Sequence, residues 1–184
     1  MENVYKVDNL GLKKGDLELI DYNENYSIIF EKEKKALENI FNGKYIKIEH
    51  IGSTAIKNIK SKPIIDILVT CKDLKEFIEF TQKYVESSQY TTKEETKSGD
   101  FLIRKEEDGK VKAFIHVYPE DNEEAINCII FRDYLNAHIE EAKKYENLKL
   151  ELYNKYKSNR PKYTEGKNEY VKAIINKAKN EEYR

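Results

Sequence analysis

One short segment of this chain, residues 63–69, is apolar throughout except for a single carboxylate. Such continuous apolarity is typical of a β-strand that other elements cover on both faces, so it places the segment inside a layered fold. Burial of its carboxylate, Asp66, is costly unless a metal ion, a lysine or hydrogen-bond donors lie beside it. We therefore treat Asp66 as a candidate functional residue, with a carboxylate that caps a neighbouring loop as the alternative.

Alternation of polar and apolar residues predicts the rest of the sheet. Residues 45–51 alternate with period two and then run into a polar turn. Asp108-Gly109 separates two further alternating segments, 89–107 and 110–118, and this dipeptide is typical of a tight antiparallel hairpin. We expect these segments to form a sheet with the strand at 63–69.

Apolar residues at helical spacing fill the remaining length. They are most regular in the last third of the chain, where Arg160-Pro161 is expected to break the run. The expected fold class is α/β (α+β): a mixed sheet flanked by helices, with a helical C-terminal third. The expected helices cover 25–41, 72–87, 123–137, 139–156 and 164–179.

The length and the apolar content indicate one ordinary domain. The chain has 184 residues, of which 39% are hydrophobic, enough to build a buried core. Residues 1–16 are polar and contain two glycines, so we expect a loosely structured N-terminus before a single domain at 17–184. No apolar run approaches the roughly 20 residues of a membrane helix, and no secretion signal opens the chain, so no membrane partner is expected.

Charge and cysteine content narrow the function classes. The 33 basic and 34 acidic residues nearly cancel, which disfavours nucleic acid as the main partner and makes any anion site local. Cys71 and Cys128 are far apart and outside any CxxC pattern, which argues against structural zinc and favours a reducing, cytoplasmic location. The oligomeric state stays open.

The turn Gly52-Ser53-Thr54 follows the strand at 45–51. Glycine allows close backbone approach, and hydroxyls with nearby amides can hold a phosphate; an ordinary turn is the alternative. Two neighbouring strands would bring Ser53 and Asp66 to one edge of the sheet, with Lys62 just before the second strand. A carboxylate, hydroxyls and a cation are what a phosphate ester bound with Mg²⁺ requires.

Several other residues are weaker candidates. Glu49 and His50 point to opposite faces of their strand, so one of them can join Asp66. His116 lies in an apolar strand, where it is either a metal ligand or a hydrogen-bonded core residue. Four further basic residues are candidates for binding the phosphate of a nucleotide: Arg104, Lys105, Arg132 and Lys167. The alternatives are that they form surface ion pairs or are ordinary residues at the start of a helix.

Two of these stretches resemble a known family. Residues 49–54 (EHIGST) and 62–67 (KPIIDI) are similar to the signature of the GrpB family, a bacterial and archaeal group in the polymerase-beta-like nucleotidyltransferase superfamily. The resemblance extends over roughly residues 17–180. It includes LIDYN at 19–23, FLIRK at 101–105, IHV at 115–117 and FRDYLNAH at 131–138.

This resemblance implies a fold, which is a mixed sheet with flanking helices, and an activity, which is nucleotidyl transfer. The reaction moves a nucleoside monophosphate from a nucleoside triphosphate to a hydroxyl of a small-molecule or RNA acceptor, and pyrophosphate leaves. Gly52, Ser53 and Thr54 match the phosphate turn, and Asp66 matches the first acid that binds a divalent cation such as Mg²⁺. The expected catalytic residues are Asp66, Glu49 and Ser53, and the expected metal ligands are Asp66, Glu49 and His116.

The chain departs from the superfamily pattern at two positions. Leu68 stands where the second acid is expected, and His116 stands where the third is expected. Because two divalent ions need several carboxylates, a site of Asp66, Glu49 and His116 is expected to hold one ion rather than two. Two functions therefore remain open: a metal-assisted nucleotidyltransferase, or a catalytically degenerate module that binds a nucleotide or phosphorylated metabolite. A purely structural or partner-binding role ranks below both.

Overall fold

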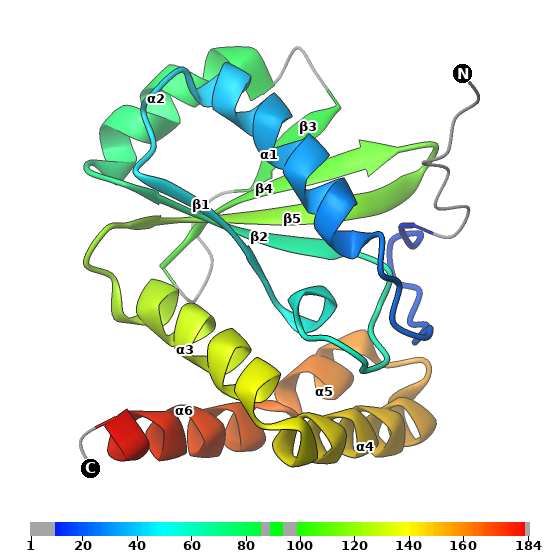
Figure 1. The fold of residues 1–184 in the computed structure, drawn as a ribbon. Helices are drawn as coiled ribbons and strands as arrows, with labels where there is room; N and C mark the ends of the chain where they lie inside the picture. Colours follow the sequence, from blue (N-terminus) through cyan, green and yellow to red (C-terminus); the bar gives the residue numbers. More distant parts are fainter. Residues whose placement is uncertain (1–9, 86–88, 94–98, 183–184) are drawn as a thin grey trace.

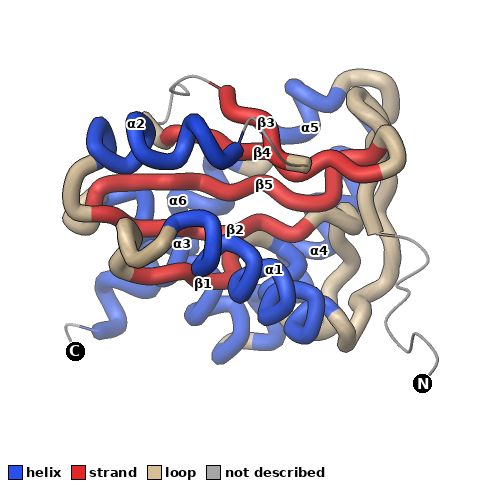
Figure 2. Tube along the Cα trace, turned by 90° about the horizontal axis from the view of Figure 1, so that it is seen from above, coloured by secondary structure: helices blue, strands red, loops and turns tan. Residues whose placement is uncertain are grey.

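A five-stranded mixed sheet forms the centre of the computed structural model, which describes residues 10–85, 89–93 and 99–182. The strands run in the order β1-β2-β5-β4-β3, side by side in Figure 2. β2 and β5 are parallel, and the other neighbours are antiparallel. The strands are β1 (Lys47–Ile51), β2 (Ile65–Cys71), β3 (Tyr90–Lys93), β4 (Phe101–Glu107) and β5 (Lys110–Pro119).

Two helices cover one face of the sheet (Figure 1). They are α1 (Tyr26–Phe41) and α2 (Leu74–Val85). Ile65, Ile67 and Val69 of β2 point toward them and share the main core with Phe41 and Phe77. Because side chains alternate along a strand, the intervening residues of β2, Asp66 and Leu68, point to the opposite face.

Four helices lie on that opposite face (Figure 1). Leu68 packs there with Ile51 and Ala125, which attaches the first of these helices to β1 and β2. The helices also form a small core of their own, which takes in Ile56 and Ile59 from the segment between β1 and β2. They are α3 (Glu123–Ala137), α4 (Ile139–Tyr156), α5 (Arg160–Glu165) and α6 (Asn168–Glu182).

The structure confirms the predicted fold class, a mixed sheet flanked by helices with a helical C-terminal third. Asp108 and Gly109 both have positive φ, 53° and 71°, and close the predicted hairpin between β4 and β5. The segment 89–107 forms two strands rather than one, and residues 94–98 lie outside the described residues. Arg160-Pro161 begins α5, since proline fits the first turn of a helix and the Asn159 side chain caps that turn.

The start of the described chain is tied to the sheet. Of the segment expected to be loosely structured, residues 1–9 lie outside the described residues. Leu12, by contrast, is only 5% exposed and forms a β-bridge with Val111, because its side chain completes a small apolar cluster with Ile64. Across the described ranges, no helix is long and apolar enough to span a bilayer.

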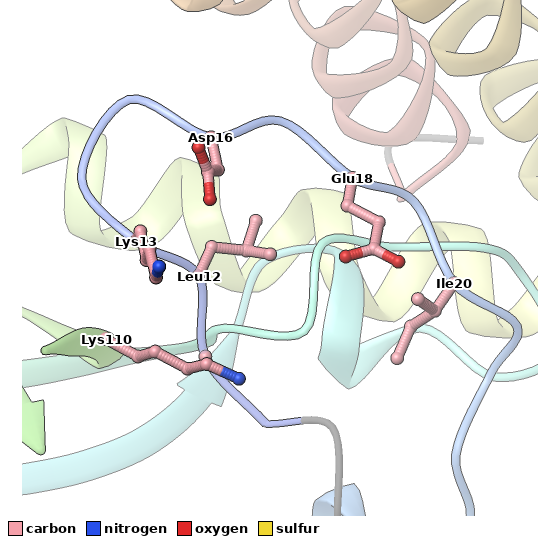
Figure 3. A pocket seen from close by; sticks show the side chains of 7 residues that line it. Leu12, Lys13, Asp16, Glu18, Ile20 and Lys110 are labelled. Carbon is pink, nitrogen blue, oxygen red and sulfur yellow. The ribbon is translucent and has the colours of Figure 1, made fainter. Parts of the chain in front are cut away.

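A small pocket lies beside this N-terminal segment (Figure 3). Its volume is about 190 Å³, below the range typical of ligand sites. None of its lining residues is among the candidate site residues predicted from the sequence. The pocket is lined by Gly11, Leu12, Lys13, Asp16, Glu18, Ile20 and Lys110.

Candidate functional site

The turn after β1 touches the carboxylate of Asp66. Ile51, the last residue of β1, pairs with Asp66 in the antiparallel ladder, and the chain then turns at Gly52 with φ of +71°. A Cβ atom placed on Gly52 would overlap the Asp66 side chain, so only glycine fits here. This packing brings Ser53 and Asp66 to the same edge of the sheet.

Ser53 also meets the C-terminal helices. Its Oγ lies 3.5 Å from the phenolic oxygen of Tyr145 on α4, a side chain that is only 4% exposed. Burial raises the pKa of Tyr145 to about 12, with a further rise from the Asp66 carboxylate and an opposing effect of the Ser53 hydrogen bond. Tyr145 is therefore a neutral phenol at pH 7. Thr54 is buried, and its hydroxyl is hydrogen-bonded to His50 Nε2 at 2.9 Å.

Three cationic side chains form a group in the region of Asp66. Burial lowers the pKa of Lys62 to about 8; the Asp66 charge raises it, whereas Lys167 and Arg160 lower it further. Burial likewise lowers the pKa of Lys167, again with Asp66 opposing the shift and Arg160 adding to it. The Arg160 guanidinium carbon lies 5.8 Å from the ring centroid of Phe114, which pairs with Asp66 in the parallel ladder. Lys62 and Lys167 thus interact with the Asp66 carboxylate, and Arg160 interacts with both lysines.

A fourth cation, Lys149 of α4, is more deeply buried. Its side chain is 1% exposed, donates to the backbone carbonyl of Lys60 and lies 4.7 Å from the ring of Tyr145. Burial lowers the pKa of Lys149 to about 7, and the charges of Lys167 and Lys62 contribute to the shift. We call Asp66, Lys62, Lys149, Arg160 and Lys167 the Asp66 cluster.

Sequence reasoning missed part of this cluster. Lys149 and Tyr145 fall within the amphipathic pattern of one long helix, and nothing local separates them from packing residues. Arg160 carried a weak signal, since it is one of only four arginines in a lysine-rich chain. Lys62 and Lys167 were both predicted as nucleotide-binding residues, and the structure brings them together beside Asp66.

Glu49 shares the sheet face of Asp66 but is held by an arginine. Its Oε2 accepts from Arg132 Nη1 at 2.9 Å, while the same guanidinium donates to the His50 carbonyl and to Asp133. The negative charge of Glu49 is therefore paired with the positive charge of Arg132. His50 lies on the opposite face, stacked on Phe30, and burial with the Arg132 charge lowers its pKa to about 4.

His116 is paired as well. Its Nδ1 lies 2.7 Å from Oδ2 of Asp100, a carboxylate that is 2% exposed. His116 itself is half-buried, so it is a hydrogen-bonded histidine, as in the alternative considered from the sequence, but not a core residue. Leu68, at the position of the second acid, is fully buried among apolar side chains from α3 and the sheet.

The expected metal ligands do not form a group. Nowhere in the described ranges do three His, Cys, Asp or Glu side chains lie where they could hold an ion together. Glu49 is bound to Arg132 and His116 to Asp100, so the donors expected to join Asp66 are engaged elsewhere. The charged neighbours of Asp66 are cations, which is the opposite of what a Mg²⁺ site requires. The donor set does not fit the divalent cation that the resemblance implies.

Arg104 and Lys105 lie on opposite faces of β4. Arg104 pairs with Phe114 across the ladder, and its Nε lies 2.6 Å from Glu106. Lys105 points toward α1, where its Nζ lies 2.5 Å from Oε2 of the buried Glu33. Adjacent residues of a strand cannot both reach one site, so the structure leaves Lys105 outside the Asp66 cluster.

Comparisons with known proteins identify the family. Residues 16–177 match the family described as GrpB protein. The glutamate-rich protein GrpB of Alkalihalophilus pseudofirmus is 37% identical over 180 residues, which cover 91% of this chain and 98% of that protein. YqkA of Bacillus subtilis is 33% identical over 90% of this chain and 48% of its own length. The crystal structure of the conserved protein GrpB from Enterococcus faecalis matches with a TM-score of 0.82 at 30% identity, covering 91% of this chain and all of the other. The chain therefore belongs to the GrpB family.

Proposed function

We propose that this protein binds a nucleotide by its phosphates at the Asp66 cluster. The observation that carries the proposal is the packing of Gly52 against Asp66, with Ser53 next in the turn and with Lys62 and Lys167 acting on the same carboxylate. Hydroxyl groups and cations that converge on one point are suited to phosphate oxygens.

The charge balance supports an anionic ligand. Buried cations that repel one another lower each other's pKa, and a phosphate placed between them relieves this repulsion. Asp66 alone cannot neutralise the four cationic groups of the cluster. A ligand that carries several negative charges therefore gains more at this site than a neutral one.

The test is binding of nucleoside triphosphates, measured by thermal shift and calorimetry. We expect a rise in melting temperature with at least one triphosphate, and a smaller rise with the corresponding nucleoside. If the bare nucleoside binds as tightly as the triphosphate, the phosphates are not what the site recognises, and the proposal fails.

Nucleotidyl transfer is a second candidate function, favoured by the position of Asp66 as a carboxylate among phosphate-binding groups. In this reaction an acceptor hydroxyl of a small molecule or an RNA end gives its proton to Asp66 and forms a bond to the α-phosphorus. The bond from that phosphorus to the bridging oxygen breaks, pyrophosphate leaves, and the proton passes from Asp66 to solvent. Lys62 and Lys167 would stabilise the charge on the departing pyrophosphate.

Release of labelled pyrophosphate separates transfer from simple binding. A screen of acceptor hydroxyls is expected to give turnover that Asp66→Asn abolishes. If nucleotides bind and no acceptor supports pyrophosphate release, the protein is the alternative predicted from the sequence, a module that binds a nucleotide or phosphorylated metabolite without transferring anything.

A further inference from the structure

We infer that the Asp66 cluster neutralises a polyphosphate chain with its own lysine and arginine side chains, in place of divalent metal ions. The inference rests on the proposed function, because it concerns the same site. It specifies the ligand as a chain of linked phosphates, and it separates this protein from metal-dependent sites that bind the same kind of ligand.

The first step of the argument is the number of charges. The cluster contains four cationic groups and one carboxylate. Lys62 and Lys167 interact electrostatically with Asp66. Arg160 and Lys149 in turn each interact with these two lysines. The acid that interacts with Lys149 is Glu146, and Glu146 is already paired with Lys143 at 3.0 Å. The site therefore carries a net positive charge when no ligand is bound.

The second step is that the side chains expected to bind a metal ion with Asp66 are either apolar or bound to other residues. Leu68 is buried in an apolar cluster, Glu49 is bound to Arg132, and His116 is bound to Asp100. A divalent cation at Asp66 would meet one carboxylate and several positive charges, so it would be repelled rather than held. A polyphosphate at the same place would be attracted by these positive charges.

The third step is the spread of the cations. Lys62 precedes β2, Lys149 lies on α4, Arg160 opens α5, and Lys167 precedes α6. Arg160 stands beside Phe114 on the β5 side, whereas Lys149 stands beside Tyr145 and the Lys60 carbonyl. Because these cations have different neighbours, a chain of linked phosphates can approach more of them than a single phosphate can.

Calorimetry with inorganic tripolyphosphate and orthophosphate, in EDTA and in Mg²⁺, tests the inference on the wild-type protein. Tripolyphosphate is expected to bind in EDTA at least as tightly as in Mg²⁺, because Mg²⁺ removes charge from the ligand. It is also expected to bind about tenfold more tightly than orthophosphate.

Strict dependence on Mg²⁺ would overturn the inference and leave nucleotide binding intact. Nucleotide binding without any binding of tripolyphosphate would also overturn it, since the nucleoside would then carry recognition. If neither nucleotide nor tripolyphosphate binds in either buffer, both the inference and the proposed function fail.

The Asp66→Asn substitution tests the inference because a metal site and a cation site predict opposite changes in affinity. In a metal site this change removes a ligand and weakens binding. In a cation site it removes a negative charge that repels the phosphates, so tripolyphosphate affinity in EDTA should rise several-fold, by about threefold or more. Asp121→Asn, at an exposed position, removes the same charge elsewhere and should leave the affinity unchanged. Weaker binding by Asp66→Asn would contradict the inference.

Arg160→Gln provides a second variant in case Asp66→Asn folds poorly. The loss of this guanidinium should weaken tripolyphosphate binding by about tenfold in EDTA and in Mg²⁺ alike. Unchanged affinity in the folded variant would show that Arg160 does not contribute, and the inference would be rejected.

Discussion

The carboxylate of Asp66 packs directly on the Cα atom of Gly52, at the point where the chain leaves β1. No side chain fits between the two residues, and the positive φ of Gly52 directs Ser53 toward the helices on the same side. The relationship ties the strand that carries the acid to the turn that carries the hydroxyl. It is the geometric basis of the phosphate site proposed above.

Gly52→Ala should destabilise the protein by about 2–4 kcal/mol, because it adds both backbone strain and a clash with Asp66. Gly43→Ala is the matched control: Gly43 also has positive φ, +77°, but a Cβ there meets nothing within 4 Å. Urea unfolding of both variants separates the two effects. Equal losses of unfolding free energy would mean that the contact with Asp66 is not close.

Ser53→Ala should weaken nucleotide binding by about three- to tenfold and change stability by less than about 1 kcal/mol. Stability changes little because the hydrogen bond from Ser53 to Tyr145 is long, 3.5 Å. Ser27→Ala, on the exposed side of α1, serves as the control in both measurements. Calorimetry that shows unchanged affinity for Ser53→Ala would exclude the hydroxyl from the phosphate site.

Lys167→Met should weaken nucleotide binding by about tenfold and leave the ligand-free protein as stable as the wild type or more so. Burial and Arg160 both disfavour the Lys167 charge when no ligand is present, so removal of the charge costs little there. Lys172→Met, whose side chain is 71% exposed, should change neither quantity. A variant that loses stability but keeps its affinity would identify Lys167 as a structural residue.

The lowered pKa values of two buried lysines should make stability rise with pH between about pH 7 and pH 9. Lys149 and Lys62 have folded-state pKa values near 7 and 8, below the value of 10.5 in the unfolded chain. In this window the unfolded state binds more protons than the folded state, so a higher pH favours folding, by at most about 1.4 kcal/mol per pH unit for each group. The contribution is complete above pH 10.5 and is lost as the pH falls through the folded values.

Lys149→Met is the variant that checks this pH dependence. It should flatten the rise in unfolding free energy between pH 7 and pH 9, while Lys172→Met should retain the wild-type slope. Chemical denaturation at several pH values gives both slopes. An identical slope in wild type and Lys149→Met would show that Lys149 is protonated throughout the range.

Local signals made one half of the site predictable. Asp66 stands out because it interrupts an apolar strand, and Gly52-Ser53 because it ends the strand before it. Their meeting follows from the antiparallel pairing of β1 with β2, which places Ile51 opposite Asp66. Both residues lie within a short stretch of chain, so little tertiary information was needed to bring them together.

The other half depends on how helices dock, which a single sequence does not encode locally. Tyr145 lies near Asp66, and Lys149 and Arg160 near Lys62 and Lys167, only because α4 and α5 fold back under the sheet (Figure 1). Glu49 could be assigned to a strand but not to a partner, because Arg132 lies on a helix far along the chain. Leu12 likewise pairs with Val111 across a large sequence separation.

A crystal structure with a bound nucleoside triphosphate tests the central claim most directly. The account predicts phosphate oxygens within hydrogen-bonding distance of Ser53 Oγ and of the ammonium groups of Lys62 and Lys167. A nucleotide bound elsewhere, such as beside the N-terminal segment at Gly11 and Lys110, with the Asp66 cluster free of phosphate, would contradict it.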